Sequence, residues 1–180
     1  MIIGKNFLPG SSPMTKKIIW TVVFCFTAAV LQSTLLSHLA FYRAVPDIAL
    51  CIIVYSAYVN GVMTGQLSGF FSGIVIDFLS ASPPGLNAFV RTIIGMLAGL
   101  MKGTFFLDLI ILPVILCTSA TLLKAFILLL LNLLVSKMIA VYPLAAPTLW
   151  AELALNAFMA PFLFAFLKRF RSLISGRNEV

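Results

Sequence analysis

The feature that most constrains this chain is a series of apolar runs long enough to cross a lipid bilayer. The first run, Ile18–Leu39, holds 22 residues and no charged side chain, and a helix needs about 20 apolar residues to span the hydrocarbon core. Hydrophobic residues make up 62% of the sequence and charged residues only 9%, whereas soluble domains carry roughly 25% charged residues. We therefore expect an all-α membrane protein.

Glycine, proline and asparagine divide the apolar sequence into six predicted transmembrane helices. The predicted ranges are 18–39, 44–60, 62–80, 86–102, 106–141 and 148–167, between a cytoplasmic tail at 1–17 and a basic cytoplasmic tail at 168–180. The second range is short for a span, so we expect either a tilted crossing or a re-entrant pair with the third. In the long fifth range, Pro113 is expected to separate an interfacial lead-in from the helix proper.

The basic residues gather at the two ends of the chain and give most of its formal net charge of +7. Cytoplasmic segments of membrane proteins are enriched in Lys and Arg, so we predict that both termini are cytoplasmic and that the number of crossings is even. No basic stripe with interleaved aromatic residues is present, which argues against nucleic-acid binding. The basic residues at the ends are Lys5, Lys16 and Lys17, then Lys168, Arg169, Arg171 and Arg177.

Two consecutive predicted helices carry glycine at every fourth position. Glycine at this spacing lets two helix backbones approach closely, and close packing drives the association of helices in lipid. We therefore expect the third and fourth helices to form an antiparallel pair along these rows. The packing residues of the two rows are Gly65, Gly69 and Gly73, then Gly95, Gly99 and Gly103.

Each glycine row is extended by a charged residue near the predicted outer side of the membrane. Asp77 continues the first row and Arg91 precedes the second. An uncompensated charge inside a helix bundle costs roughly 2.5 kcal/mol or more, and arginine can hold a carboxylate with two parallel hydrogen bonds. We therefore predict a buried ion pair between Asp77 and Arg91. It would serve either as a clamp that fixes helix register or as a site that engages a partner helix or a polar lipid.

Four other polar residues within the predicted helices are candidates for contacts between helices. Gln32 could bond a neighbouring helix, either in this chain or in a partner. Glu152 and Asn156 lie one turn apart, shortly before Pro161, where they form a contact face for a partner or satisfy backbone groups that the proline frees. Lys124 could reach the membrane surface or pair with a carboxylate.

The sequence lacks the residue constellations of a membrane enzyme. Ser68 has no histidine downstream that could act as its base, because His38 is the only histidine. No metal-ligand spacing or phosphate-binding loop occurs, and the three cysteines lie in apolar runs without a C-x-x-C pair. We expect no catalysis, no cofactor and no metal. Two function classes stay open: an assembly protein that docks other membrane proteins, and a small-solute transporter or its solute-binding subunit.

Several stretches resemble the bacterial rod-shape-determining MreD family. The most specific is the pattern G-F-x-x-G-x-x-x-D-x-x-S at 69–80, followed by Gly85-Leu86. The run Pro46-Asp47-Ile48 and the stretch Asn156-Ala157…Ala160-Pro161 in the last helix are also similar to that family. The resemblance covers about residues 31 to 171.

This resemblance implies a multi-pass protein of the bacterial cytoplasmic membrane that belongs to the cell-elongation machinery. It further implies binding to a single-span MreC-type protein, and a link between the actin-like MreB filament and the enzymes that insert peptidoglycan. The family also looks like the six-helix substrate-binding subunits of energy-coupling-factor transporters. Because one fold can serve several functions, a solute-binding subunit of a vitamin transporter stays open as the alternative.

Overall fold

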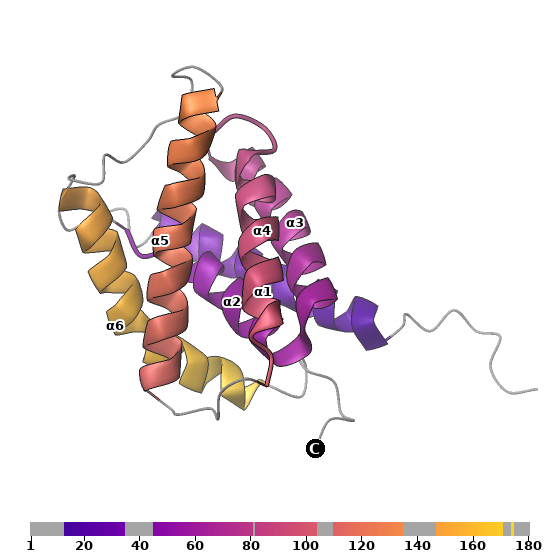
Figure 1. Cartoon of the computed structure of the whole chain (residues 1–180). Coiled ribbons are helices and arrows are strands. Elements are labelled where there is room, and N and C mark those ends of the chain that lie inside the picture. Colours follow the sequence, from indigo (N-terminus) through magenta and orange to yellow (C-terminus); the bar gives the residue numbers. More distant parts are fainter. Residues whose placement is uncertain are drawn as a thin grey trace, which may run out of the picture.

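A computed structural model describes residues 13–34, 45–80, 82–103, 110–134, 147–170 and 174. All regular secondary structure in these residues is helical, and the six predicted helices are present (Figure 1). They are α1 (Pro13–Thr34), α2 (Ile48–Asn60), α3 (Val62–Leu79), α4 (Leu86–Leu100), α5 (Ile111–Leu134) and α6 (Pro147–Arg169).

The predicted helix boundaries differ most at α1. This helix begins at Pro13, five residues before the predicted start, so Lys16 and Lys17 lie on its first turns and not in a tail. Proline suits the first position of a helix because the N–H group it lacks would have no partner there. The predicted ends at 35–39, 106–109 and 135–141 lie outside the described residues.

Four of the helices are long and apolar enough to cross a membrane: α1, α3, α5 and α6. By contrast, α2 has 13 residues and α4 has 15. At a rise of 1.5 Å per residue these two are about 20 and 22 Å long, which is less than the roughly 30 Å of a hydrocarbon core. Six helices are therefore confirmed, but length and composition support four spans and not six.

The short helix α2 forms the centre of the bundle and packs against each of the other five helices. Its residues from Ala49 to Tyr58 are all buried. A helix that is apolar on every side has to be enclosed by other helices or by lipid, and α2 is enclosed by protein. Two polar contacts tie it to α1: the hydroxyls of Thr21 and Ser56 lie 2.8 Å apart, and the thiol of Cys25 lies 3.6 Å from the carbonyl oxygen of Ala49.

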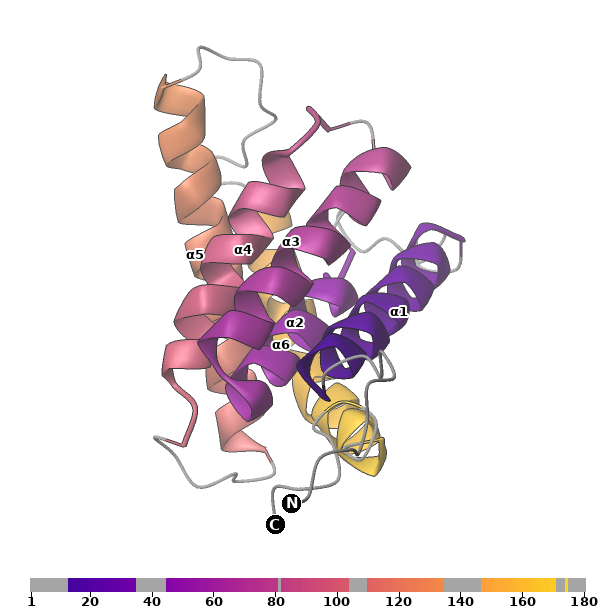
Figure 2. The ribbon, with the colours of Figure 1, turned by 90° about the vertical axis from the view of Figure 1, so that its right-hand side faces the viewer.

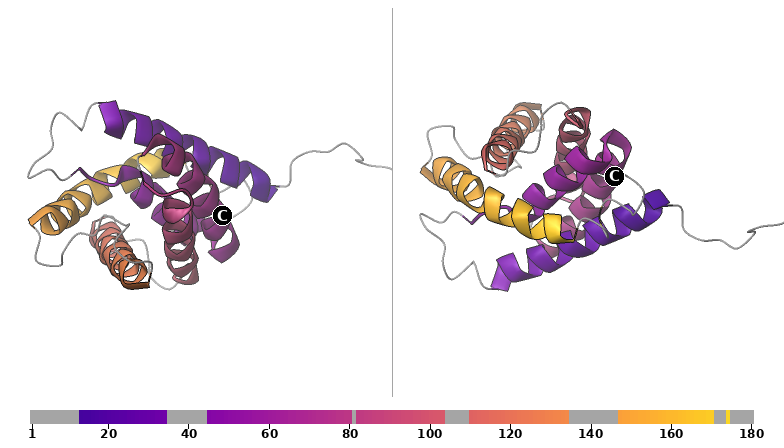
Figure 3. Two further views of the ribbon diagram at one scale, coloured as in Figure 1. Left: turned by 90° about the horizontal axis from the view of Figure 1, so that it is seen from above. Right: turned by 90° about the horizontal axis from the view of Figure 1, so that it is seen from below.

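The helices around α2 fall into two orientations. Figure 2 shows α3, α4 and α5 standing side by side, with α1 crossing them at an angle. In the views from above and below, α1 and α6 extend across the picture because both are inclined to the other three (Figure 3). Large apolar side chains such as Trp20, Phe71, Phe126 and Phe158 are exposed on the outside, as expected for a surface that faces lipid.

Candidate functional site

The contact between α3 and α4 is a backbone-to-backbone contact along the glycine rows. A Cβ atom added to Gly65 would lie 2.2 Å from the carbonyl oxygen of Gly95, and one added to Gly69 would lie 2.3 Å from that of Arg91. Real Cβ atoms essentially never approach another heavy atom within 3.0 Å, so this geometry requires glycine. The same holds for Gly73 against Ala88 and for Gly99 against Val62.

One member of the predicted rows lies outside this contact. Gly103 follows α4 in a left-handed conformation, with φ of +75°, and no atom of the described residues lies within 4 Å of the place that a Cβ would take. The expectation that Gly103 packs against the third helix is therefore wrong. Its role is in the backbone turn, since a positive φ is easily adopted only by glycine.

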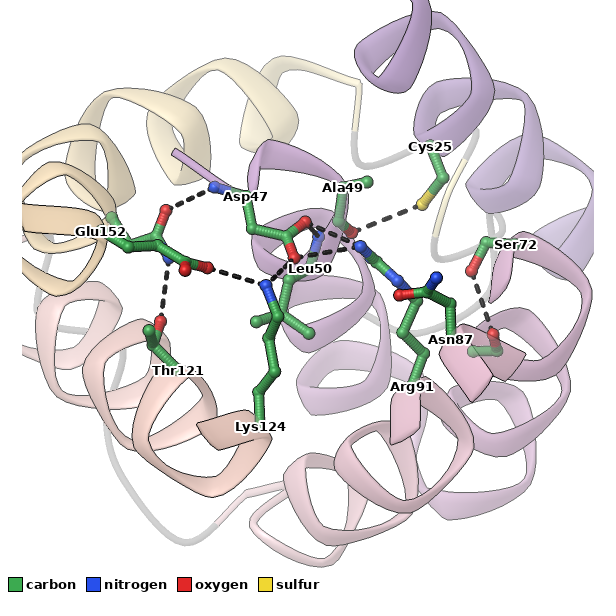
Figure 4. Close-up of polar contacts among 12 residues, drawn as sticks. Cys25, Asp47, Ala49, Leu50, Ser72, Asn87, Arg91, Thr121, Lys124 and Glu152 are labelled. Carbon is green, nitrogen blue, oxygen red and sulfur yellow. Dashed lines mark hydrogen bonds and ion pairs between the residues drawn. The ribbon is translucent and has the colours of Figure 1, made fainter. Parts of the chain in front are cut away.

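The centre of the charged site is Asp47, which directly precedes α2 and caps it. Its carboxylate accepts a hydrogen bond from the backbone N–H of Leu50 at 3.0 Å. Nη2 of Arg91, on α4, lies 2.8 Å from Oδ1 and 3.0 Å from Oδ2 of the same carboxylate (Figure 4). Asp47 is 4% exposed and Arg91 5%, so this is an ion pair inside the protein.

A second cation reaches the same carboxylate from α5. Nζ of Lys124 lies 2.9 Å from Oδ2 of Asp47 and 2.7 Å from Oε1 of Glu152 on α6. Lys124 therefore bridges two buried acids (Figure 4). Of the two possibilities for this lysine, the structure shows pairing with carboxylates.

Neutral hydrogen bonds complete the network. The backbone N–H of Asp47 donates to Oδ1 of Asn156 at 2.7 Å, and Nδ2 of Asn156 donates to the hydroxyl of Thr121 at 2.9 Å. Thr121 in turn donates to the carbonyl of Cys117 at 2.8 Å. Side chains from α4, α5 and α6 thus converge on the start of α2.

The predicted Asp77–Arg91 ion pair is wrong, because the structure pairs Arg91 with Asp47. The backbone of Arg91 lies against Gly69 of α3, so its side chain leaves α4 on another side, toward α2. Asp77 has a different role: its carboxylate accepts hydrogen bonds from the backbone N–H groups of Gly85, Asn87 and Ala88 at 2.9, 3.0 and 3.2 Å. A carboxylate is stabilised at a helix N-terminus, and Asp77 holds the start of α4 in this way.

The residues predicted as possible partner contacts lie in two kinds of place. Glu152 and Asn156 are buried and bond to groups of this chain, so neither offers a surface for another protein. Their partners are Lys124, Thr121 and Asp47, and not the backbone groups that Pro161 frees. Gln32 is half-buried on α1, and its contact with a partner stays a prediction.

The charges of the network sum to zero, since it holds two acids and two bases. One polar atom of the network is left over: Nη1 of Arg91 is buried and makes no hydrogen bond to the described residues. In the part of the chain that the structure describes, no group of three His, Cys, Asp or Glu could hold a metal ion. The arrangement can hold four elements in register, and it presents no nucleophile with a base.

Sequence reasoning missed Asp47 as a member of the charged site. The residue lies near the start of the predicted second helix, 44–60, where no partner was assigned to it, although it belongs to one of the stretches that resemble the MreD family. Its position directly before a helix is a signal for a cap. Nothing in the spacing of the sequence indicated that this cap would be buried beside Arg91 and Lys124.

The fold and the site define a small multi-pass membrane protein whose interior charges neutralise one another. The chain matches the family model of the rod shape-determining protein MreD over residues 14–170. It belongs to that family, as the resemblance in its sequence indicated, and its role is in the determination of rod shape and thus in the cell wall. Comparisons with curated proteins and with solved structures gave no match.

Proposed function

We propose that this chain is a non-catalytic scaffold of the rod complex in the bacterial cytoplasmic membrane. It binds a single-span MreC-type partner and so links the actin-like MreB filament to the enzymes that insert peptidoglycan. The observation that carries this proposal is the family match over residues 14–170. That match spans all six helices.

The distribution of polar and apolar side chains supports a role in binding within the membrane. The four charged side chains of the buried network neutralise one another, whereas large apolar residues on α1, α3, α5 and α6 are exposed. A transmembrane partner helix would meet an apolar surface of this kind. In lipid such a contact depends on close packing and not on the exclusion of water.

The proposal is tested by depleting the chain from a rod-shaped bacterium that carries it. Depletion should make the cells wide and round, and a tagged copy should restore the rod. When this copy is purified in a mild detergent, a single-span MreC-type protein should copurify in a fixed ratio. A tagged multi-pass protein of similar size is the control.

Two results would contradict the scaffold function. If cells keep their rod shape after depletion, the proposed role in shape is wrong. If the tagged copy purifies without the single-span protein, the proposed partner is wrong. A vitamin that copurifies in a one-to-one ratio would favour the alternative, a solute-binding subunit of a transporter.

A further inference from the structure

The helices α5 and α6 form a hairpin that meets the rest of the bundle along one seam. They pack on each other, and they reach the other helices mainly through α2 and α4. Near the start of α2, two hydrogen bonds of Asp47 cross this seam. One is the contact of Lys124 with its carboxylate, and the other is the hydrogen bond from its backbone N–H to Asn156.

Each side of the seam is electrically neutral by itself. Asp47 and Arg91 pair on one side, and Lys124 and Glu152 pair on the other. If the seam opened, every charge would keep an opposite charge as a neighbour. The large cost of an unpaired charge in a membrane interior therefore does not oppose the separation.

At the other end of the seam, the contacts are mainly apolar, together with one hydrogen bond of 3.1 Å from Nδ2 of Asn60 to the carbonyl oxygen of Ile174. The rings of Tyr55 on α2 and Phe164 on α6 meet edge to face at a centroid distance of 5.0 Å, and Phe170 meets Phe24 of α1 at 5.7 Å. Leu167 is also buried there. Apolar area and ring contacts hold this end together, and they contain no charged group that could take a new partner if the helices separated.

Between the polar and the aromatic contacts, α6 contains Pro161. A proline inside a helix removes one backbone hydrogen bond and favours a kink at that point. The ribbon of α6 changes direction along its length (Figure 1). Asn156, on the polar side, and Phe164, on the aromatic side, lie five residues before and three residues after this proline.

We propose that α5 and the part of α6 before Pro161 form a hinged arm, and that Lys124 is the latch that closes it. In the closed state Lys124 bridges Glu152 on the arm and Asp47 on the body (Figure 4). In the open state Lys124 stays with Glu152 and Asp47 stays with Arg91, while the part of α6 after Pro161 stays against Tyr55 and Phe24. A partner that binds one state better than the other would shift the balance between them.

The test is a pair of distance measurements by double electron–electron resonance on the full chain in detergent or lipid. Cys25, Cys51 and Cys117 are first replaced by alanine. Spin labels are then placed on exposed positions, with a reference at Phe71→Cys on α3 and a second label at Ala154→Cys, before Pro161, or at Phe166→Cys, after it. The latch is removed by Lys124→Met combined with Glu152→Gln, which keeps the buried charge at zero.

Loss of the latch removes one hydrogen bond between charged groups, so the ratio of open to closed molecules should rise about tenfold or more. A longer distance should then appear for the 71–154 pair, while the 71–166 distance stays as in the chain with its latch. If both distances stay unchanged, Lys124 is no latch and the proposal fails. If both lengthen together, the hairpin or the whole fold loosens and the hinge at Pro161 is overturned.

Discussion

At the scale of single residues, the partner of a charged side chain depends on the direction in which it leaves its helix as much as on its position along the helix. Asp77 and Arg91 lie on neighbouring helices at positions that look equivalent in the sequence, yet they bond to different groups. Asp77 caps the start of α4, and Arg91 crosses to Asp47. Asp47 and Asp77 should therefore contribute very different amounts to the free energy of unfolding.

The change Asp47→Asn should be far more damaging than Asp77→Asn. The first leaves Arg91 and Lys124 with Glu152 as their one acid, and loss of a partner in a buried ion pair costs about 3 kcal/mol or more. The second weakens a helix cap near the surface, which costs about 1 kcal/mol. Thermal unfolding of both variants in detergent measures the difference. An equal or larger loss in Asp77→Asn would show that Asp47 is not the centre of the network.

The sequence was sufficient to predict that the interior charges would be neutralised, but it led to the wrong acid for Arg91. Spacing places a residue along a helix, whereas the direction of its side chain depends on the neighbour that the helix packs against. Because the backbone of Arg91 packs against Gly69, the guanidinium group has to leave α4 on another side of the helix. Asp47 was out of reach of such reasoning, because nothing local shows that the start of the second predicted helix lies beside Arg91 inside the bundle.

At the scale of helices, the small residues of α3 and α4 set the distance between the two backbones. The predicted pairing of these helices rests on a regular pattern, and such patterns carry over well from sequence to structure. The pattern fails at Gly103 because α4 ends at Leu100, so the residue is no longer on the helix face. Helix α2 shows a second limit of prediction from sequence, because an apolar run does not reveal whether protein or lipid encloses it.

The change Gly65→Ala should separate α3 from α4. The added Cβ would lie 2.2 Å from the carbonyl oxygen of Gly95 and 2.7 Å from the Cβ of Ala57, and overpacking of this kind costs typically 1–3 kcal/mol, here about 3. The matched change Gly103→Ala meets no atom of the residues that the structure describes and should cost about 1 kcal/mol through its positive φ. The yield of folded protein and its melting temperature in detergent compare the two. Equal effects would mean that the close contact contributes nothing beyond backbone conformation.

At the scale of the whole molecule, the basic residues predict how the bundle lies in the membrane. Lys168 and Arg169 form the last turn of α6 and are exposed, and positive charges favour the cytoplasmic side. A C-terminal green fluorescent protein should therefore fluoresce in cells, and a C-terminal alkaline phosphatase should be inactive. An N-terminal fusion should give the same result. An active phosphatase at one end only would mean an odd number of crossings. An active phosphatase at both ends would mean that both termini lie on the outer side of the membrane.

The position of Asp47 has a consequence for how the protein is made. Residues 91, 124, 152 and 156, which surround it in the finished bundle, are all synthesised after it, the last of them 109 residues later. Until Arg91 is synthesised, α2 carries an acid without a counter-charge, and this helix is too short to cross the bilayer alone. The chain up to α3 therefore has to stay at the translocon or beside another protein until α4 follows, so nascent chains that stop before α4 should be degraded quickly.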